Sequence, residues 1–125
     1  MNAINWFEIP ATETSRAREF YSHLVGKQLE VQNFGGNDMI FFPYDPAKGG
    51  VGGAIVRDPR MTPGAQGTLV YLAAQNLPGG LDGALSRVPA AGGEVVAPRT
   101  GIGEHGFIAI FKDSEGNVIG LHAPA

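Results

Sequence analysis

Cysteine is absent from this chain of 125 residues. Disulfides, thiolate chemistry and cysteine-ligated metals are therefore excluded, and the composition suits a reducing cytoplasm, where we expect the protein to act. A basic surface stripe is also lacking: the formal net charge is −3. This charge balance argues against nucleic acid or an anionic membrane as the main partner. No stretch approaches the ~20 apolar residues that span a bilayer, and we expect no signal peptide at the N-terminus.

Glycine, in contrast, is abundant, with 19 residues in the chain against a usual share of ~7%. These glycines are scattered singly and in pairs between apolar runs, a distribution typical of turns and bulges and not of a disordered linker. The chain length allows one well-buried core, or two small halves that share one.

The first half of the chain predicts a βαβββ order. Strands are expected at residues 4–9, 29–34, 39–42 and 51–56, with a turn at 35–38 and a loop at 43–50. The single helix is expected to begin at Thr12–Glu13–Thr14, residues that favour helix N-caps, and to stop at Gly26. Its apolar residues recur at helical spacing: Ala17, Phe20, Tyr21 and Leu24.

The second half predicts the same order after a proline- and glycine-rich linker at 58–67. It comprises a strand at 68–74, a helix at 77–91 ended by Gly92–Gly93, a strand at 94–96, and a hairpin with strands 107–111 and 118–121 around the turn 113–117. Residues 6–9 align with 69–72 at an offset of 63, and 51–55 align with 118–122 at an offset of 67. We therefore expect one domain over residues 1–125, made of modules 1–57 and 68–125.

Side chains alternate between the two faces of a strand, so each strand can be assigned a helix-covered face and an open face. The open faces of two such curved halves are expected to enclose a cleft. Aromatic walls together with a carboxylate, a phenol and an imidazole are typical of a small-molecule pocket. The residues expected in this cleft are Trp6, Glu8, Gly53, Leu69, Tyr71, Gly120 and His122.

Two segments resemble the vicinal oxygen chelate superfamily, which includes glyoxalase I, bleomycin-resistance proteins, fosfomycin-resistance enzymes and extradiol dioxygenases. Residues 6–21, WFEIPATETSRAREFY, are similar to its first strand and helix, and residues 111–121, FKDSEGNVIGL, are similar to its Phe-x-Asp-Pro-x-Gly-Asn-x-Ile-Glu-Leu ending. The resemblance implies an α+β fold of two tandem βαβββ modules forming a curved mixed sheet around a cleft. It also implies a homodimer, as is common in the superfamily, and it does not by itself imply a reaction.

The superfamily's metal site usually takes one His, Glu or Gln from each of the first, fourth, fifth and eighth strands. Carried over by the resemblance and the repeat offset, these positions fall at Trp6, Gly53, Leu69 and Gly120. None of these side chains binds a divalent ion. We therefore expect neither a metal nor another cofactor. A shifted metal site built from Glu8, His105 and His122 is the alternative.

Glu8 and His122 lie two residues beyond lost ligand positions and are the candidate general acid and base. The expected ligand contacts are Trp6, Glu8, Tyr71, His105, Phe107 and His122, the pair at 105 and 107 lying at the rim of the cleft. Three functions remain open. The first is a metal-free small-molecule binding protein of the glyoxalase/bleomycin-resistance type. The second is a lyase, isomerase or dioxygenase-like enzyme that uses Glu8 and His122. The third is an interaction subunit with a vestigial cleft.

Overall fold

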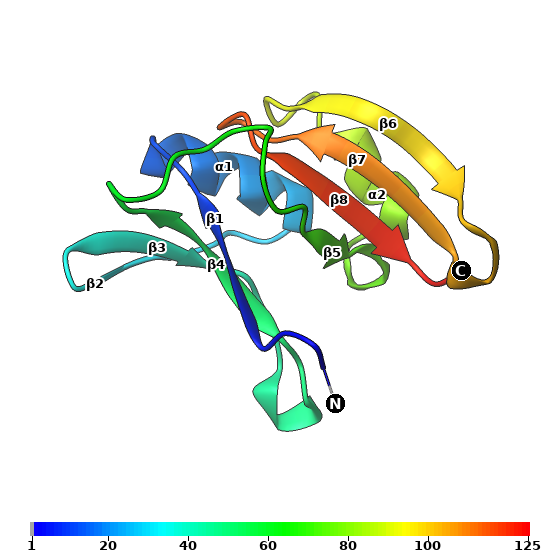
Figure 1. Cartoon of the computed structure of the whole chain (residues 1–125), viewed down its shortest axis with the longest axis horizontal. Coiled ribbons are helices and arrows are strands. Elements are labelled where there is room, and N and C mark those ends of the chain that lie inside the picture. The colour runs from blue at the N-terminus through cyan, green and yellow to red at the C-terminus, as the bar shows by residue number, and fades with distance from the viewer. Residues whose placement is uncertain (1) are drawn as a thin grey trace.

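The computed structural model describes residues 2–125 and confirms the α+β fold (Figure 1). Eight strands form two mixed four-stranded sheets: sheet A has the order β1-β4-β3-β2, and sheet B the order β5-β8-β7-β6. In each sheet the first and last strands of the module pair in parallel, and the other neighbours pair antiparallel. Within the described residues, no helix combines the length and apolarity needed to cross a membrane.

The elements follow the expected order twice. The first module contains β1 (Trp6–Pro10), α1 (Thr14–Val25), β2 (Val31–Phe34), β3 (Asn37–Phe41), the 3-10 turn η1 (Pro46–Lys48) and β4 (Gly52–Arg57). The second contains β5 (Tyr71–Ala73), η2 (Ala74–Asn76), α2 (Gly80–Arg87), β6 (Glu94–Gly101), η3 (Gly103–His105), β7 (Phe107–Lys112) and β8 (Val118–Ala123).

The second module differs most from the predicted boundaries. The helix expected at 77–91 is α2, and it ends at Arg87. Pro89 has no backbone N–H to continue the ladder, and Val88 instead donates to Leu85 in a tighter turn. The strand expected at 94–96 is β6, which continues to Gly101 with two register shifts against β7. The strand expected at 68–74 is reduced to the three residues of β5.

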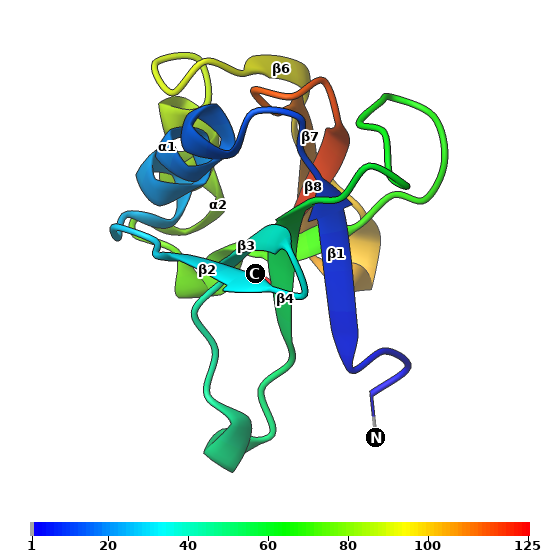
Figure 2. The same ribbon diagram turned by 90° about the vertical axis from the view of Figure 1, so that its left-hand side faces the viewer.

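One hydrophobic core joins the two sheets. In Figure 2 both helices lie on one side of β1, β7 and β8, and the connection at residues 58–67 loops out on the other side. From α1, the ring of Phe20 packs 5.8 Å from that of Phe111 in β7, and the ring of Tyr21 packs 5.4 Å from that of Phe42 beyond β3. A single helix therefore buries aromatic side chains against both modules.

The register of strand pairing shows that one residue was assigned to the wrong face of its strand. Ile9 pairs with Ile55, and Leu72 with Leu121, and all four side chains are in the core. The offset between β4 and β8 is therefore 66, not 67, and a shift of one residue moves every side chain to the other face. Gly53 was predicted on the open face, and this is wrong. It pairs with Phe7, whose ring lies where a Cβ of residue 53 would be.

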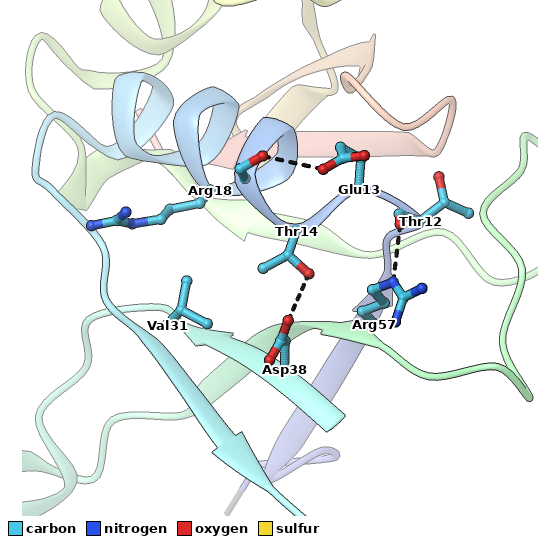
Figure 3. A pocket seen from close by; sticks show the side chains of 8 residues that line it. Thr12, Glu13, Thr14, Arg18, Val31, Asp38 and Arg57 are labelled. Carbon is cyan, nitrogen blue, oxygen red and sulfur yellow. Dashed lines mark hydrogen bonds between the residues drawn. The ribbon is translucent and has the colours of Figure 1, made fainter. Parts of the chain in front are cut away.

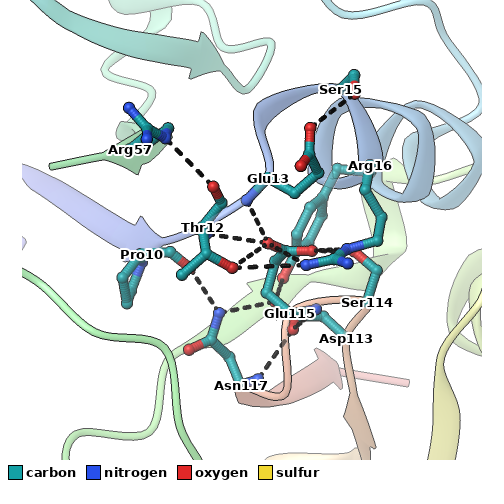
Figure 4. A network of polar contacts seen from close by, with 11 residues as sticks. Pro10, Thr12, Glu13, Ser15, Arg16, Arg57, Asp113, Ser114, Glu115 and Asn117 are labelled. Atoms are coloured by element: carbon teal, nitrogen blue, oxygen red, sulfur yellow. Dashed lines mark hydrogen bonds and ion pairs between the residues drawn. The ribbon is translucent and has the colours of Figure 1, made fainter. Parts of the chain in front are cut away.

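The turn between β7 and β8 supplies the N-terminal cap of α1 (Figure 4). The Thr12–Glu13–Thr14 caps expected from the sequence are not formed, because Glu13 occupies the N-cap position without a side-chain cap. Instead the Glu115 carboxylate accepts hydrogen bonds from the backbone N–H groups of Thr12 and Glu13, each at 2.9 Å, and from the Arg16 guanidinium. A carboxylate at this end also complements the helix dipole.

Below this cap, Asp113 is buried and fully hydrogen-bonded. Its carboxylate accepts the Tyr21 hydroxyl at 2.6 Å, the backbone N–H groups of Glu115 and Asn117, and the Asn117 side-chain amide. That amide also donates to the Pro10 carbonyl at the end of β1. Burial, with the neighbouring Asp113 carboxylate, raises the pKa of Tyr21 well above its usual range. The hydrogen bonds of the turn 113–117 therefore link the second module to the first.

Candidate functional site

The open face of sheet B carries a pocket of about 430 Å³. A volume of this size is within the ~300–1,000 Å³ range of small-molecule sites. Strands β5, β7 and β8 contribute residues to its lining, and so does residue 102, just before η3. Most of the lining is aliphatic, with a phenol and an imidazole as the polar groups. The lining residues are Tyr71, Leu72, Ala73, Ile102, Ile108 and His122.

Gly120 has a specific role beside this pocket. It pairs with Tyr71 across the parallel β5–β8 ladder, and the Tyr71 ring occupies the space in which a Cβ of residue 120 would lie. Gly120 is buried, whereas Tyr71 is 43% exposed. The missing side chain therefore lets an aromatic ring lie against the sheet at the pocket wall.

His122 is fixed by one hydrogen bond. It stands opposite Ile108 in the β7–β8 ladder, and its Nε2 lies 2.7 Å from the backbone carbonyl oxygen of His105. A carbonyl oxygen can only accept a hydrogen bond, so Nε2 carries a proton and donates it. The His105 side chain is 77% exposed, and it is the backbone of this residue that contributes to the site.

The open face of sheet A presents a different surface. The Trp6 indole N–H donates to the Glu8 carboxylate at 3.2 Å, which confirms that these two side chains share a face. The Trp6 ring also lies edge-on to Phe41 and Tyr44, with centroids 5.8 and 6.1 Å apart. Phe34 extends the series through an edge-on contact with Phe41. We refer to Phe34, Phe41, Trp6 and Tyr44 as the aromatic row.

The expected site residues thus fall into two groups. Tyr71 and His122 line the pocket on sheet B, and Trp6 and Glu8, which are not among its lining residues, form a hydrogen-bonded pair on the other sheet. Phe107 packs against the core, with the Arg99 guanidinium 3.9 Å above its ring. Its neighbour Ile108 lines the pocket instead, and the alternation within 107–111, combined with the hairpin pairing, was the signal that could have identified it.

A second pocket, also of about 430 Å³, opens between the N-terminus of α1 and the end of sheet A (Figure 3). Its lining is polar, and the polar groups bond to one another or to the backbone. Thr14 donates to Asp38, and Arg57 and Arg18 donate to the carbonyls of Thr12 and Leu29. No local sequence pattern indicates this pocket, because its residues come from four separate segments. Its polar groups are largely satisfied within the protein.

The positions that would hold the superfamily's metal offer no ligands. With the corrected offset of 66, the fourth-strand counterpart of Gly120 is Ala54, which pairs with Glu8, so the set reads Trp6, Ala54, Leu69 and Gly120. A longer side chain at 120 would also meet the Tyr71 ring. In residues 2–125 no group of three or more histidines and carboxylates is placed to hold a metal ion. The side chains present do not fit the superfamily's metal site.

Comparison with known proteins identifies the fold of the chain. Neither models of protein families nor curated proteins give a match to the sequence, but solved structures do. A glyoxalase/bleomycin resistance protein from Albidiferax ferrireducens superposes with a TM-score of 0.71 at 18% identity, covering 99% of this chain and all of that one. An antibiotic binding protein from a Streptomyces species gives 0.66 at 23% identity, covering 100% and 98%.

The fosfomycin resistance protein FosX from Listeria monocytogenes gives a TM-score of 0.62 at 15% identity, covering 100% of this chain and 93% of that one. The superposition extends over nearly the whole chain in each case. The chain therefore has the glyoxalase/bleomycin-resistance fold, and the resemblance indicated by residues 6–21 and 111–121 is confirmed at the level of the fold. At these identities the reaction or ligand of a neighbour does not transfer with the fold.

Proposed function

We propose that this chain is a member of the vicinal oxygen chelate superfamily that acts as a small-molecule binding protein of the glyoxalase/bleomycin-resistance type, without the usual divalent metal. The observation that carries the proposal is the apolar pocket on sheet B, in which Tyr71 and His122 are the polar groups among aliphatic side chains. Apolar walls with a few directed polar groups are the usual composition of a ligand site. Similarity to an antibiotic binding protein and to resistance proteins supports this choice.

The metal-free part of the proposal depends on side-chain chemistry. Indole, methyl and isobutyl groups, and the hydrogen of a glycine, present no lone pair to a divalent ion. The rival reading, a shifted site from Glu8, His105 and His122, is not favoured, because among residues 2–125 no group of three or more histidines and carboxylates is placed to hold a metal ion.

Metal analysis of the protein purified without chelator tests this part. We expect substoichiometric Ni, Zn, Mn and Fe, and no change in melting temperature when EDTA is added. One equivalent of any of these metals, lost in a Glu8→Gln, His122→Ala double variant, would establish the shifted site instead. His23→Ala serves as the matched control, because His23 lies on α1 and its Nδ1 is 2.8 Å from the Glu19 carbonyl oxygen.

Ligand binding is tested by amide chemical-shift titration with a panel of aromatic compounds. We expect shifts concentrated at residues 71–73, 102–108 and 120–122. Shifts concentrated instead around Trp6 and Glu8 would move the site to sheet A. Turnover that disappears in both Glu8→Gln and His122→Ala would favour the enzyme hypothesis, which stays a prediction.

We further propose that the protein is a homodimer and that the aromatic row contributes to its interface. Phe34 and Tyr44 are 52% and 46% exposed, and contiguous exposed aromatic side chains are typical of interaction surfaces. Phe34→Glu is expected to convert the dimer to a monomer in sedimentation experiments. Val96→Glu is the control, since Val96 is 53% exposed but lies on β6, outside the row. A wild-type monomer at high micromolar concentration would reject the proposal.

A further inference from the structure

We propose that the pocket on sheet B selects an uncharged, flat aromatic molecule that donates one hydrogen bond, such as a phenol or naphthol, and that the Nδ1 atom of His122 accepts this bond. The inference deepens the proposed function and rests on it. It follows from the hydrogen bond that fixes His122, from the lining of the pocket and from the position of Tyr71 against Gly120.

The hydrogen bond to His105 determines which nitrogen of His122 is free. Nε2 is 2.7 Å from a backbone carbonyl oxygen, so in the neutral form of the imidazole the proton is on this nitrogen. Nδ1 then carries a lone pair and acts as an acceptor. Among residues 2–125 no hydrogen bond to this atom is present. The ring that lines the pocket therefore offers a ligand an acceptor and no donor.

The rest of the lining excludes other classes of ligand. Leu72, Ala73, Ile102 and Ile108 have no polar side-chain atom, and no lysine or arginine lines the pocket. A carboxylate would enter without a counterion and would face the lone pair of Nδ1, a costly arrangement. A pure hydrocarbon would cover Nδ1 and leave it unpaired, which also costs binding energy.

Tyr71 accounts for the preference for a flat ring. Its own ring is held against the sheet because residue 120 has no side chain. An exposed aromatic surface in this position can stack on a planar ligand, with ring centroids at the usual ~4.5–7 Å. The Tyr71 hydroxyl is the other polar side-chain group of the lining.

Three matched probes test the ligand class: 2-naphthol, 2-methylnaphthalene, and 2-naphthoate at a pH at which it is ionised. Amide chemical shifts of residues 71–73 and 120–122 follow their binding. We expect 2-naphthol to bind about tenfold more tightly than 2-methylnaphthalene, as one well-formed hydrogen bond allows, and 2-naphthoate to bind more weakly than either. His122→Phe is expected to remove the advantage of 2-naphthol, and His23→Phe to preserve it.

The outcomes separate the two levels of the proposal. Equal binding of 2-naphthol and 2-methylnaphthalene to the wild type would overturn the ligand class and leave the binding function standing. Preferred binding of 2-naphthoate would also overturn it. Binding of none of the probes at millimolar concentration would overturn both. Should His122→Phe fail to fold, long-range ¹H–¹⁵N spectra of the wild-type imidazole decide: a protonated Nδ1 in the neutral ring would reject the inference.

Discussion

The two modules repeat the same strand order but end in different connections before their last strand. In the first module the connection between β3 and β4 runs from residue 42 to 51 and projects away from the sheets (Figure 1). Its Asp45 carboxylate accepts one local hydrogen bond, from the Ala47 N–H, at an exposed site. In the second module the turn 113–117 is short, Asp113 and Asn117 are buried in it, and its Asp113, Glu115 and Asn117 side chains bind α1 and β1 of the first module.

The difference extends to the helices. α1 has twelve residues and receives a carboxylate cap from the other module, whereas α2 has eight and its N-cap residue, Gly79, provides no side-chain cap. A duplicated fold thus preserves the order of elements without preserving the role of each turn. Here the turn of the second module's hairpin links the two modules, whereas the corresponding loop of the first module contributes Tyr44 to the aromatic row.

The largest effect is expected from Asp113→Ala. The substitution leaves the Tyr21 hydroxyl and the N–H groups of Glu115 and Asn117 without their acceptor in a site where Asp113 is 4% exposed. We expect the free energy of unfolding to fall by about 3–4 kcal/mol, measured by urea denaturation. Asp45→Ala, its counterpart in the exposed loop, should cost less than ~1 kcal/mol. Similar losses in the two variants would show that the modules do not differ in this way.

The contacts of the turn 113–117 with the first module could be predicted only in part from the sequence. Asp113, Gly116 and Asn117 were recognisable as turn residues, and residues 111–121 as a family-like ending, because turn chemistry is local. The bonds of Glu115 to Thr12 and Glu13 span 103 and 102 residues, and no local pattern encodes contacts of that separation. The expected Thr and Glu caps were therefore wrong although the start of the helix was close to correct.

The next effect tests the corrected register. Gly53→Ala would place a methyl group against the Phe7 ring, which packs against Phe42 and the core, and overpacking of this kind costs about 1–3 kcal/mol. Gly120→Ala meets the ring of Tyr71, which is 43% exposed and can swing outward, so we expect a loss below ~1 kcal/mol. Thermal unfolding of the two variants distinguishes them. Equal destabilisation would mean that Gly53 and Gly120 share one face, as the sequence offset of 67 implied.

The candidate site, too, could be predicted only in part from the sequence. Alternation correctly placed Trp6 with Glu8 and Tyr71 with His122, because strand periodicity is independent of the partner strand. Their assembly into one cleft depends on how two sheets curve, which no strand pattern encodes, and it stays a prediction. Ile102 lines the pocket because of the position of η3, which no strand or hairpin pattern gives.

The smallest effect concerns the charge of the cap. Burial alone would raise the pKa of Glu115, but hydrogen bonds from Arg16 and from the backbone of Glu13 and Thr12 lower it to about 2 from the ordinary 4.5. A folded-state pKa below the unfolded one stabilises the protein above about pH 4.5, and this stabilisation is lost as the pH falls through 2. Glu115→Gln should therefore cost about 1–2 kcal/mol at pH 7 and unfold with a shallower dependence on acid pH.

Asp58 titrates in an overlapping range and provides the comparison within the same experiment. A hydrogen bond from the Arg60 side chain, with one from its backbone, lowers the pKa of Asp58 to about 2. This pair lies within the connection 58–67, and the other hydrogen bond to Asp58, from the Asn37 amide of β3, stays within the first module. Asp58→Asn should remove its own share of the acid sensitivity and leave the Glu115 share intact. If Glu115→Gln keeps the full wild-type slope between pH 5 and 2 while Asp58→Asn abolishes it, the acid-sensitive contact is local to the connection. The contact between the modules would then depend on Asp113 and Asn117 and not on the charge of Glu115.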